Sequence, residues 1–315
     1  MALAIIGVGL VMQPTGWMAI VFLFVLVVPF EKLFPRHRGQ KVRRPGLSTD
    51  LAFALATPAL EVVGATVAVV VGLASLAWLP GLALRPLVAM LPPAILPFVG
   101  IALFDLLIYW VHRWSHEVPL LWRFHAIHHS TETLDWVSGL RNHPFDGALL
   151  APAFAFLLAA GFSAEFSGAL VAVQIVTGIF LHANVRWKWR PLQRLVITPE
   201  FHHWHHANEP EAINTNFSVF LPLWDQIFGT YRVPKDRRPT VYGVDEYVPE
   251  GLWAQLRHPF RGMRPIRSYL RHPIRTIEEL WAMTRTIVRG MRSSMFAKRR
   301  TSSRLNDRAA VPTLE

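Results

Sequence analysis

Residues 110–130 read WVHRWSHEVPLLWRFHAIHHS and contain five histidines, His112, His116, His125, His128 and His129. On an α-helix at 100° per residue, the first two lie about 40° apart and the other three fall within an arc of about 100°. Each set can therefore direct its imidazoles toward one point. Neutral imidazole binds Fe, Zn, Cu and Ni, and two histidines at i, i+4 form a helical metal clamp. A lone histidine in an apolar protein is more often a hydrogen-bonded core residue, but five so close together indicate a metal site.

The spacing of this stretch is repeated downstream. Residues 201–206 read FHHWHH, so that His202, His205 and His206 repeat the H-x2-H-H pattern, while His203 points elsewhere on a helix. His143 and His182 lie between the two stretches, and 11 of the 14 histidines fall within residues 112–206. The three spaced sets with His143 and His182 give ten candidate ligands, whereas one metal ion takes about four. The sequence therefore predicts two metals.

These segments resemble the fatty acid hydroxylase superfamily, the sterol desaturase and sphingolipid hydroxylase group. The resemblance covers residues 100–235 and rests on YWVHRWSHEVPLLWRFHAIHHS, RNHP, LHAN, TPEFHHWHH and WDQIFGTY, in that order. It implies a four-helix-type membrane protein whose histidines hold two iron ions, with O2 as co-substrate against a lipid C–H bond. The roles of His143 and His182 as ligands rest mainly on this resemblance. The sequence lacks the cytochrome-b5-like module of some members, so we expect an external electron donor, namely a ferredoxin, a cytochrome or a reductase.

Composition agrees with a membrane protein. The chain of 315 residues is 52% hydrophobic, with a mean hydropathy of +0.30. It contains no cysteine, which leaves His, Asp and Glu as metal ligands and excludes thiolate and iron–sulfur sites.

Apolar runs predict the membrane spans. They cover Gly16–Phe30, Leu51–Leu79 and Phe98–Val111, followed by a hairpin of Ala148–Gly161 and Ser167–Leu181. Pro80–Pro97 is expected to be an outer loop. The basic loop Glu31–Pro45 beside the first, uncleaved span marks the cytoplasmic side, and alternate crossings then place all histidine sets there. We therefore expect an all-α, multi-pass membrane protein of about four spans, or spans plus a hairpin, with a cytoplasmic helical cap holding the dinuclear site; in a bacterium it would lie in the inner membrane.

The C-terminal region is strongly basic. Residues 251–308 hold 14 Lys and Arg against three acids, and this local net charge of +11 equals that of the whole chain. Beside membrane spans this favours attraction to anionic lipid over nucleic-acid binding. We expect residues from 297 onward to be a disordered end. The sequence thus suggests three parts: 1–98 with the first spans and basic loop, 99–235 as the catalytic domain, and 236–315 as a basic cytoplasmic tail.

Two acids are candidates to orient the ligands from behind: Asp105, within an apolar run, and Asp225 in the WDQIFGTY motif. For Asp105, a helix-to-helix hydrogen bond is the simpler alternative.

Two functions fit the histidines: an O2-dependent diiron lipid hydroxylase or desaturase acting on a sterol, fatty acyl or sphingolipid-like substrate, and a membrane zinc transporter or metal-binding protein. A transporter would place its ligands near the bilayer midplane, whereas these histidines gather just beyond the apolar runs. This favours the oxygenase.

Overall fold

The computed structural model describes residues 14–186, 192–263, 268 and 271–296, and the predicted disordered end lies outside them. The chain forms two compact units, residues 1–263 and 264–315, which are described separately. The regular elements of the described ranges are helices, and only two isolated β-bridges occur there, Pro35 with Val185 and Ala207 with Tyr242. The prediction of an all-α fold is confirmed for these residues. The division into three parts stays a prediction.

The first two apolar runs form helices α2 (Pro14–Leu33) and α3 (Leu47–Ala74). The second run is not one straight helix as expected, because Leu47–Thr57 and Val62–Ala74 meet at an angle of 71°. Pro58 lies between these segments in the sequence, and proline removes a backbone donor and clashes with the preceding turn.

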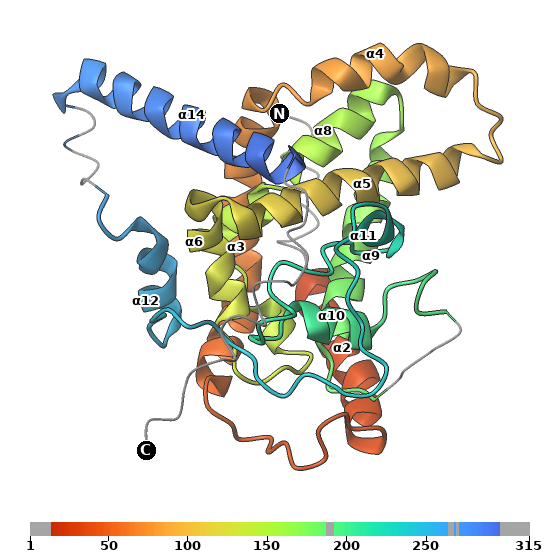
Figure 1. Cartoon of the computed structure of the whole chain (residues 1–315), viewed down its shortest axis with the longest axis vertical. Coiled ribbons are helices and arrows are strands. Elements are labelled where there is room, and N and C mark those ends of the chain that lie inside the picture. The colour runs from red at the N-terminus through yellow and green to blue at the C-terminus, as the bar shows by residue number, and fades with distance from the viewer. Residues whose placement is uncertain (1–13, 187–191, 264–267, 269–270, 297–315) are drawn as a thin grey trace, which may run out of the picture. The chain divides into compact units, whose positions relative to one another are not determined.

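The expected outer loop is mostly a helix, α4 (Trp78–Ala89). Pro80 sits in its first turn, where the missing N–H has no intrahelical partner to lose. α4 packs on α8 (Ala151–Ala160), and Figure 1 shows α8 between α4 and α5. The close approach needs a glycine at position 81, because a Cβ there would lie 2.5 Å from the Phe156 carbonyl oxygen. Helix packing thus overrides the loop signals of the sequence.

Helix α5 (Leu96–Glu117) contains the third apolar run and continues past its end, so that His112 and His116 lie in its last turns. Val118 has an extended backbone and Pro119 begins α6 (Pro119–His129), which carries the next three histidines. The bend at Val118 turns α6 back so that the two helices pack together.

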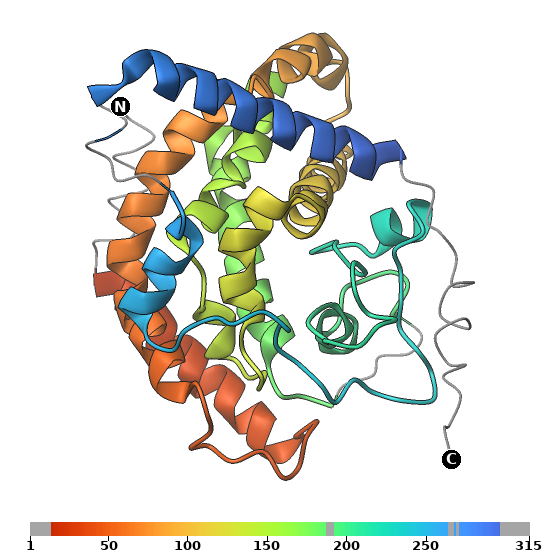
Figure 2. The ribbon, with the colours of Figure 1, turned by 60° about the vertical axis from the view of Figure 1, so that its left-hand side comes forward.

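The expected helical hairpin is present as α8 and α9 (Ala164–His182). Gly161 ends α8 with a φ of 102°, and the Ser163 hydroxyl caps α9 by accepting from the Phe166 amide. Their apolar faces join those of α4 and α5 in the main core. Short helices complete the unit: α7 (Pro144–Ala148), α10 (Pro199–His205), α11 (Leu223–Ile227), α12 (Leu252–Arg257), η1 (Ser138–Leu140) and η2 (His258–Phe260). Figure 2 shows loops from residues 206–250 around α10.

By length and composition, two described helices could cross a membrane, α5 and α9, and the bent pair in α3 would make a third. The count of about four spans stays a prediction. The second unit contains helix α14 (Pro273–Phe296).

Candidate metal centre

Nine of the ten predicted histidine ligands gather in two groups. The five-histidine group consists of His112, His116, His125, His129 and His205, and the four-histidine group of His128, His182, His202 and His206. Within each group one nitrogen per residue lies within 4.8 Å of all the others. They come from the last turns of α5, α6 and α9, from the short helix α10 and, for His206, from the residue that caps α10.

The partition follows helix geometry. Each i, i+4 pair stays together: His112 with His116 and His125 with His129 in the five-histidine group, and His202 with His206 in the four-histidine group. The middle member of each H-x2-H-H set, His128 or His205, joins the opposite group. Residues i and i+4 are about 40° apart, whereas i+3 lies about 60° to the other side of i. The expectation that each trio aims at one point is therefore wrong, because α6 and α10 each lie between the two groups and serve both.

Backbone carbonyls fix the orientation of several rings. Three histidines donate a hydrogen bond from Nδ1 to a backbone carbonyl: His112 to Phe217 (2.7 Å), His205 to Thr215 (2.9 Å) and His182 to Gly178 (2.6 Å). His128 likewise contacts Arg141 O at 3.2 Å, and His125 contacts the Asp146 carboxylate at 2.9 Å. A carbonyl or carboxylate only accepts, so Nδ1 carries the proton and the Nε2 lone pair is free in the neutral ring. Metal-binding histidines are held in this way.

The Nε2 atoms face one another at short distances. In the four-histidine group, His182 Nε2 lies 3.1 Å from His128, 3.0 Å from His206 and 3.2 Å from His202. In the five-histidine group, His129 and His125 approach to 3.2 Å. Where both Nδ1 atoms are protonated, as in His128 and His182, two lone pairs meet and no hydrogen bond forms. Ligands about 2.1 Å from one metal at angles of about 90–109° would lie about 3.0–3.4 Å apart, so the residues fit metal ions.

Burial keeps several of these rings neutral. It lowers the pKa of five of them well below the usual value, and repulsion from neighbouring histidines lowers it further; the five are His128, His129, His202, His205 and His206. The buried Nε2 atoms of His116 and His205 have no hydrogen-bond partner within the described part of the chain. Neutral imidazoles with unused lone pairs are the form that binds a metal.

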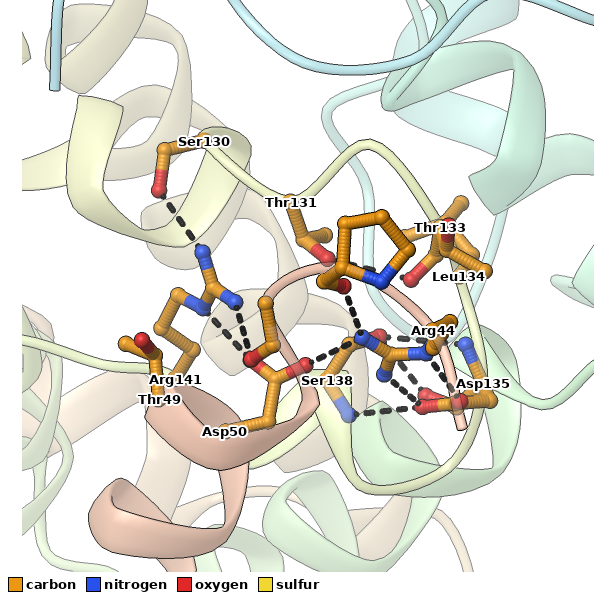
Figure 3. Close-up of polar contacts among 12 residues, drawn as sticks. Arg44, Thr49, Asp50, Ser130, Thr131, Thr133, Leu134, Asp135, Ser138 and Arg141 are labelled. Atoms are coloured by element: carbon orange, nitrogen blue, oxygen red, sulfur yellow. Dashed lines mark hydrogen bonds and ion pairs between the residues drawn. The ribbon is translucent and has the colours of Figure 1, made fainter. Parts of the chain in front are cut away.

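A buried ionic network that includes Arg141 supports His128 from behind. Figure 3 shows the network itself. The Arg141 carbonyl faces His128, while the Arg141 side chain donates to Asp50 Oδ1 at 2.5 Å, to the Gly46 carbonyl and to the Ser130 hydroxyl at the end of α6. Asp50 also pairs with Arg44 at 2.7 Å, and Arg44 in turn forms two hydrogen bonds to Asp135 at 2.6 and 2.7 Å. The network ties the start of α3 to the histidine-bearing end of α6.

The two predicted orienting acids act on one loop and do not touch the histidine rings. Asp105 accepts hydrogen bonds from the amides of residues 219, 220 and 221, at 2.9–3.1 Å. Asp225 accepts from the Phe217 and Ser218 amides and from the Thr230 hydroxyl. The same loop presents the carbonyl that holds His112. Both acids therefore stabilise a ligand indirectly, through backbone.

Two histidines of the cluster region lie outside both groups. His143 caps α7, where its Nδ1 accepts from the Phe145 amide and its Nε2 faces the Leu256 carbonyl, so the structure does not bring it to the other predicted ligands. His203 is fully buried and points away, with Nε2 donating to the Ala183 carbonyl and Nδ1 facing the Tyr242 hydroxyl. The helical wheel predicts this direction for His203.

Sequence reasoning missed Asp146, which holds His125, and the carbonyls of residues 141, 215 and 217. Asp146 follows RNHP and had a weak signal as an acid beside that motif. Carbonyl partners have no side-chain signature at all.

Comparisons with known proteins give matches over much of the chain. A family model described as fatty acid hydroxylase matches residues 97–230. The ornithine lipid hydroxylase OlsE of Rhizobium tropici is 30% identical over 254 residues, covering 77% of this chain and 72% of that protein. The alkylglycerol monooxygenase of Homo sapiens is 26% identical over 189 residues, covering 59% of this chain and 38% of that protein. The sphingolipid C4-hydroxylase sur2 of Schizosaccharomyces pombe is 30% identical over 152 residues, covering 47% and 51%. No solved structure gives a significant match.

Proposed function

This chain belongs to the fatty acid hydroxylase family, and from that membership we propose that it is a membrane-bound oxidoreductase that hydroxylates a C–H bond of a lipid with O2 and two external electrons. The observation that carries the proposal is the pair of histidine groups with facing Nε2 atoms 3.0–3.2 Å apart. Each group would hold one iron ion. Two bound irons would supply the activation of O2 that attack on an unactivated carbon requires.

The residues around the groups suggest where the substrate approaches. The four-histidine group is buried throughout, whereas His112 and His116 of the five-histidine group are partly exposed. The ring of Trp122, which is also partly exposed, lies 5.2 Å from that of His116, between ring centres. An apolar side chain beside the partly exposed ligands suits an acyl chain and helps to keep water from the reacting carbon. We therefore assign the substrate to the side of the five-histidine group.

The substrate class is a membrane lipid with an acyl chain. Among the relatives compared, OlsE shares the largest part of its length with this chain, and its name states an ornithine lipid as substrate. An ornithine lipid is thus the first substrate to test. The assay supplies labelled O2, NADPH, a reductase and an electron carrier to the purified, reconstituted protein and follows the label into the lipid by mass spectrometry.

Electrons come from a separate carrier. The printed sequence contains no cysteine for an iron–sulfur cluster, and an acidic ferredoxin or cytochrome would be attracted to a chain of net charge +11. We expect turnover to require such a carrier as well as NADPH and a reductase. Full turnover with NADPH and O2 alone would contradict this part of the proposal.

Site variants separate the oxygenase from a zinc-binding or zinc-transporting protein. Replacing His128 or His205 by Ala removes one ligand from one group, so metal content falls and product is lost. His203→Ala is the matched control, because that ring is equally buried but contacts Ala183 and Tyr242. Full metal content in both ligand variants would refute the site. Zinc in the wild type, with no oxygen-dependent product after iron reconstitution, would favour the transporter.

Orientation is the remaining element of the proposal. We place the histidine groups and the C-terminal region on the cytoplasmic side, on the basis of the basic loop and the alternate crossings of the apolar runs. The chain has no cysteine, so a single cysteine in place of the exposed Asp236 reports its side cleanly. Labelling from outside intact cells would reverse the orientation.

A further inference from the structure

Helix α14 carries a stripe of exposed apolar side chains at an interval of seven residues. Ile274, Trp281, Val288 and Met295 are between 40% and 75% exposed. At 100° per residue, successive members of the stripe shift by only about 20°, so all four lie within an arc of about 60°. A stripe of this length left in water would be costly, and it indicates a surface that the helix lies against.

Arginines line one side of the stripe. Arg285, Arg289 and Arg292 are exposed and lie about 30–90° from the centre of the stripe on the helical wheel. Thr286, also exposed, lies about 150° from that centre, on the opposite face. Glu278, also exposed, lies about 70° from that centre on the same side as the arginines, so this flank keeps a net positive charge. α14 therefore has an apolar face, a basic flank and a polar back.

This pattern identifies the class of surface. α14 has 24 residues, long enough to span a bilayer, but the arginines and two glutamates exclude it from the described helices that could cross one. A helix with an apolar face, arginines beside that face and a tryptophan on it is typical of helices that lie in the plane of a membrane surface. The arginine stems can follow the apolar boundary while their guanidinium groups reach lipid phosphates.

We propose that α14 lies in the plane of the membrane surface, with the stripe in the acyl-chain boundary and the arginines on the headgroups of anionic lipid. This inference does not depend on the proposed reaction. A second copy of the chain could in principle cover the same stripe, but the basic flank favours an anionic lipid surface.

The test uses the full chain with one introduced cysteine. Val288→Cys places a fluorescent label on the stripe and Thr286→Cys places it on the polar back, two residues away. Both proteins are reconstituted into nanodiscs of phosphatidylglycerol and phosphatidylcholine that contain brominated acyl chains. We expect the label at 288 to be blue-shifted and quenched at least about threefold more than the label at 286.

A second variant tests the role of charge. Replacing Arg285, Arg289 and Arg292 together by Gln, or omitting phosphatidylglycerol, should reduce quenching at 288. Equal quenching at both positions, or quenching at neither, would overturn the proposal. So would a label at 288 that is shielded only at high protein density in the disc, because that result would identify a second copy as the occupant.

Discussion

Replacing Asp50 by Asn should weaken both the fold and the four-histidine group. Asp50 is fully buried and pairs with Arg44 and Arg141, which are also buried. Removing one partner of a buried ion pair costs about 3–5 kcal/mol, because the remaining charge stays out of water. Asn has nearly the same shape as Asp and keeps one oxygen that can accept from Arg141, and Arg44 still pairs with Asp135. We therefore expect a loss of stability at the lower end of this range, about 3 kcal/mol. For a chain of 315 residues, that corresponds to a fall of about 4–6 °C in the unfolding temperature.

The same change should loosen the metal. The Arg141 carbonyl holds His128, and loss of such support typically reduces metal affinity about 10–100-fold. The assay combines thermal unfolding of the detergent-purified protein with metal analysis after exchange against a weak chelator. Glu279→Gln is the control, because it removes an exposed pair with Arg275 that is worth about 0.3–0.5 kcal/mol. If the unfolding temperature of Asp50→Asn lies within about 1 °C of the wild-type value and the variant keeps its metal, the network does not support the site.

Further outcomes follow from other contacts. Asp225→Asn should lower metal affinity about 10–100-fold, measured by chelator competition, because the carboxylate fixes the loop that holds His112. Metal-free protein should lose stability as pH falls below about 6.5. The buried histidines have lowered pKa values in the folded state, so below that pH the unfolded state binds protons that the folded state does not. The free energy of unfolding should fall by up to about 1.4 kcal/mol per histidine per pH unit. An unfolding temperature that stays flat from neutral to acidic pH would contradict this. Gly81→Ala should destabilise by about 1–3 kcal/mol because its Cβ would meet a carbonyl of α8, whereas Gly168→Ala, which has open space, should be neutral or slightly stabilising in the same thermal assay.

The sequence predicted which histidines come together better than it predicted how they divide between the two groups. Spacing at i, i+4 fixes two side chains on one helical face whatever the surroundings, and the structure keeps every such pair in one group. The group that takes His128 or His205 depends on what packs on the other side of α6 and α10. That information is not local, so spacing alone could not supply it.

The charges of the first basic loop show a similar limit. Read from sequence, Arg36 and Arg44 mark a side of the membrane. In the structure both are buried and paired, Arg36 with Glu200 on α10 and Arg44 with Asp50 and Asp135. Their partners lie up to 164 positions away in the chain, and no local pattern indicates such pairings. The helical hairpin could be predicted because its signal, two apolar runs separated by a short polar segment, is local.

Helices α6 and α10 each contribute ligands to both histidine groups, and this sharing has a consequence for how the protein acquires its metals. A rotation of α6 that moved His128 out of one group would displace His125 and His129 in the other. An ion bound in either group therefore holds the backbone on which the neighbouring group depends. We expect metal uptake to proceed as a single cooperative transition, with the half-filled protein scarce at every stage of loading.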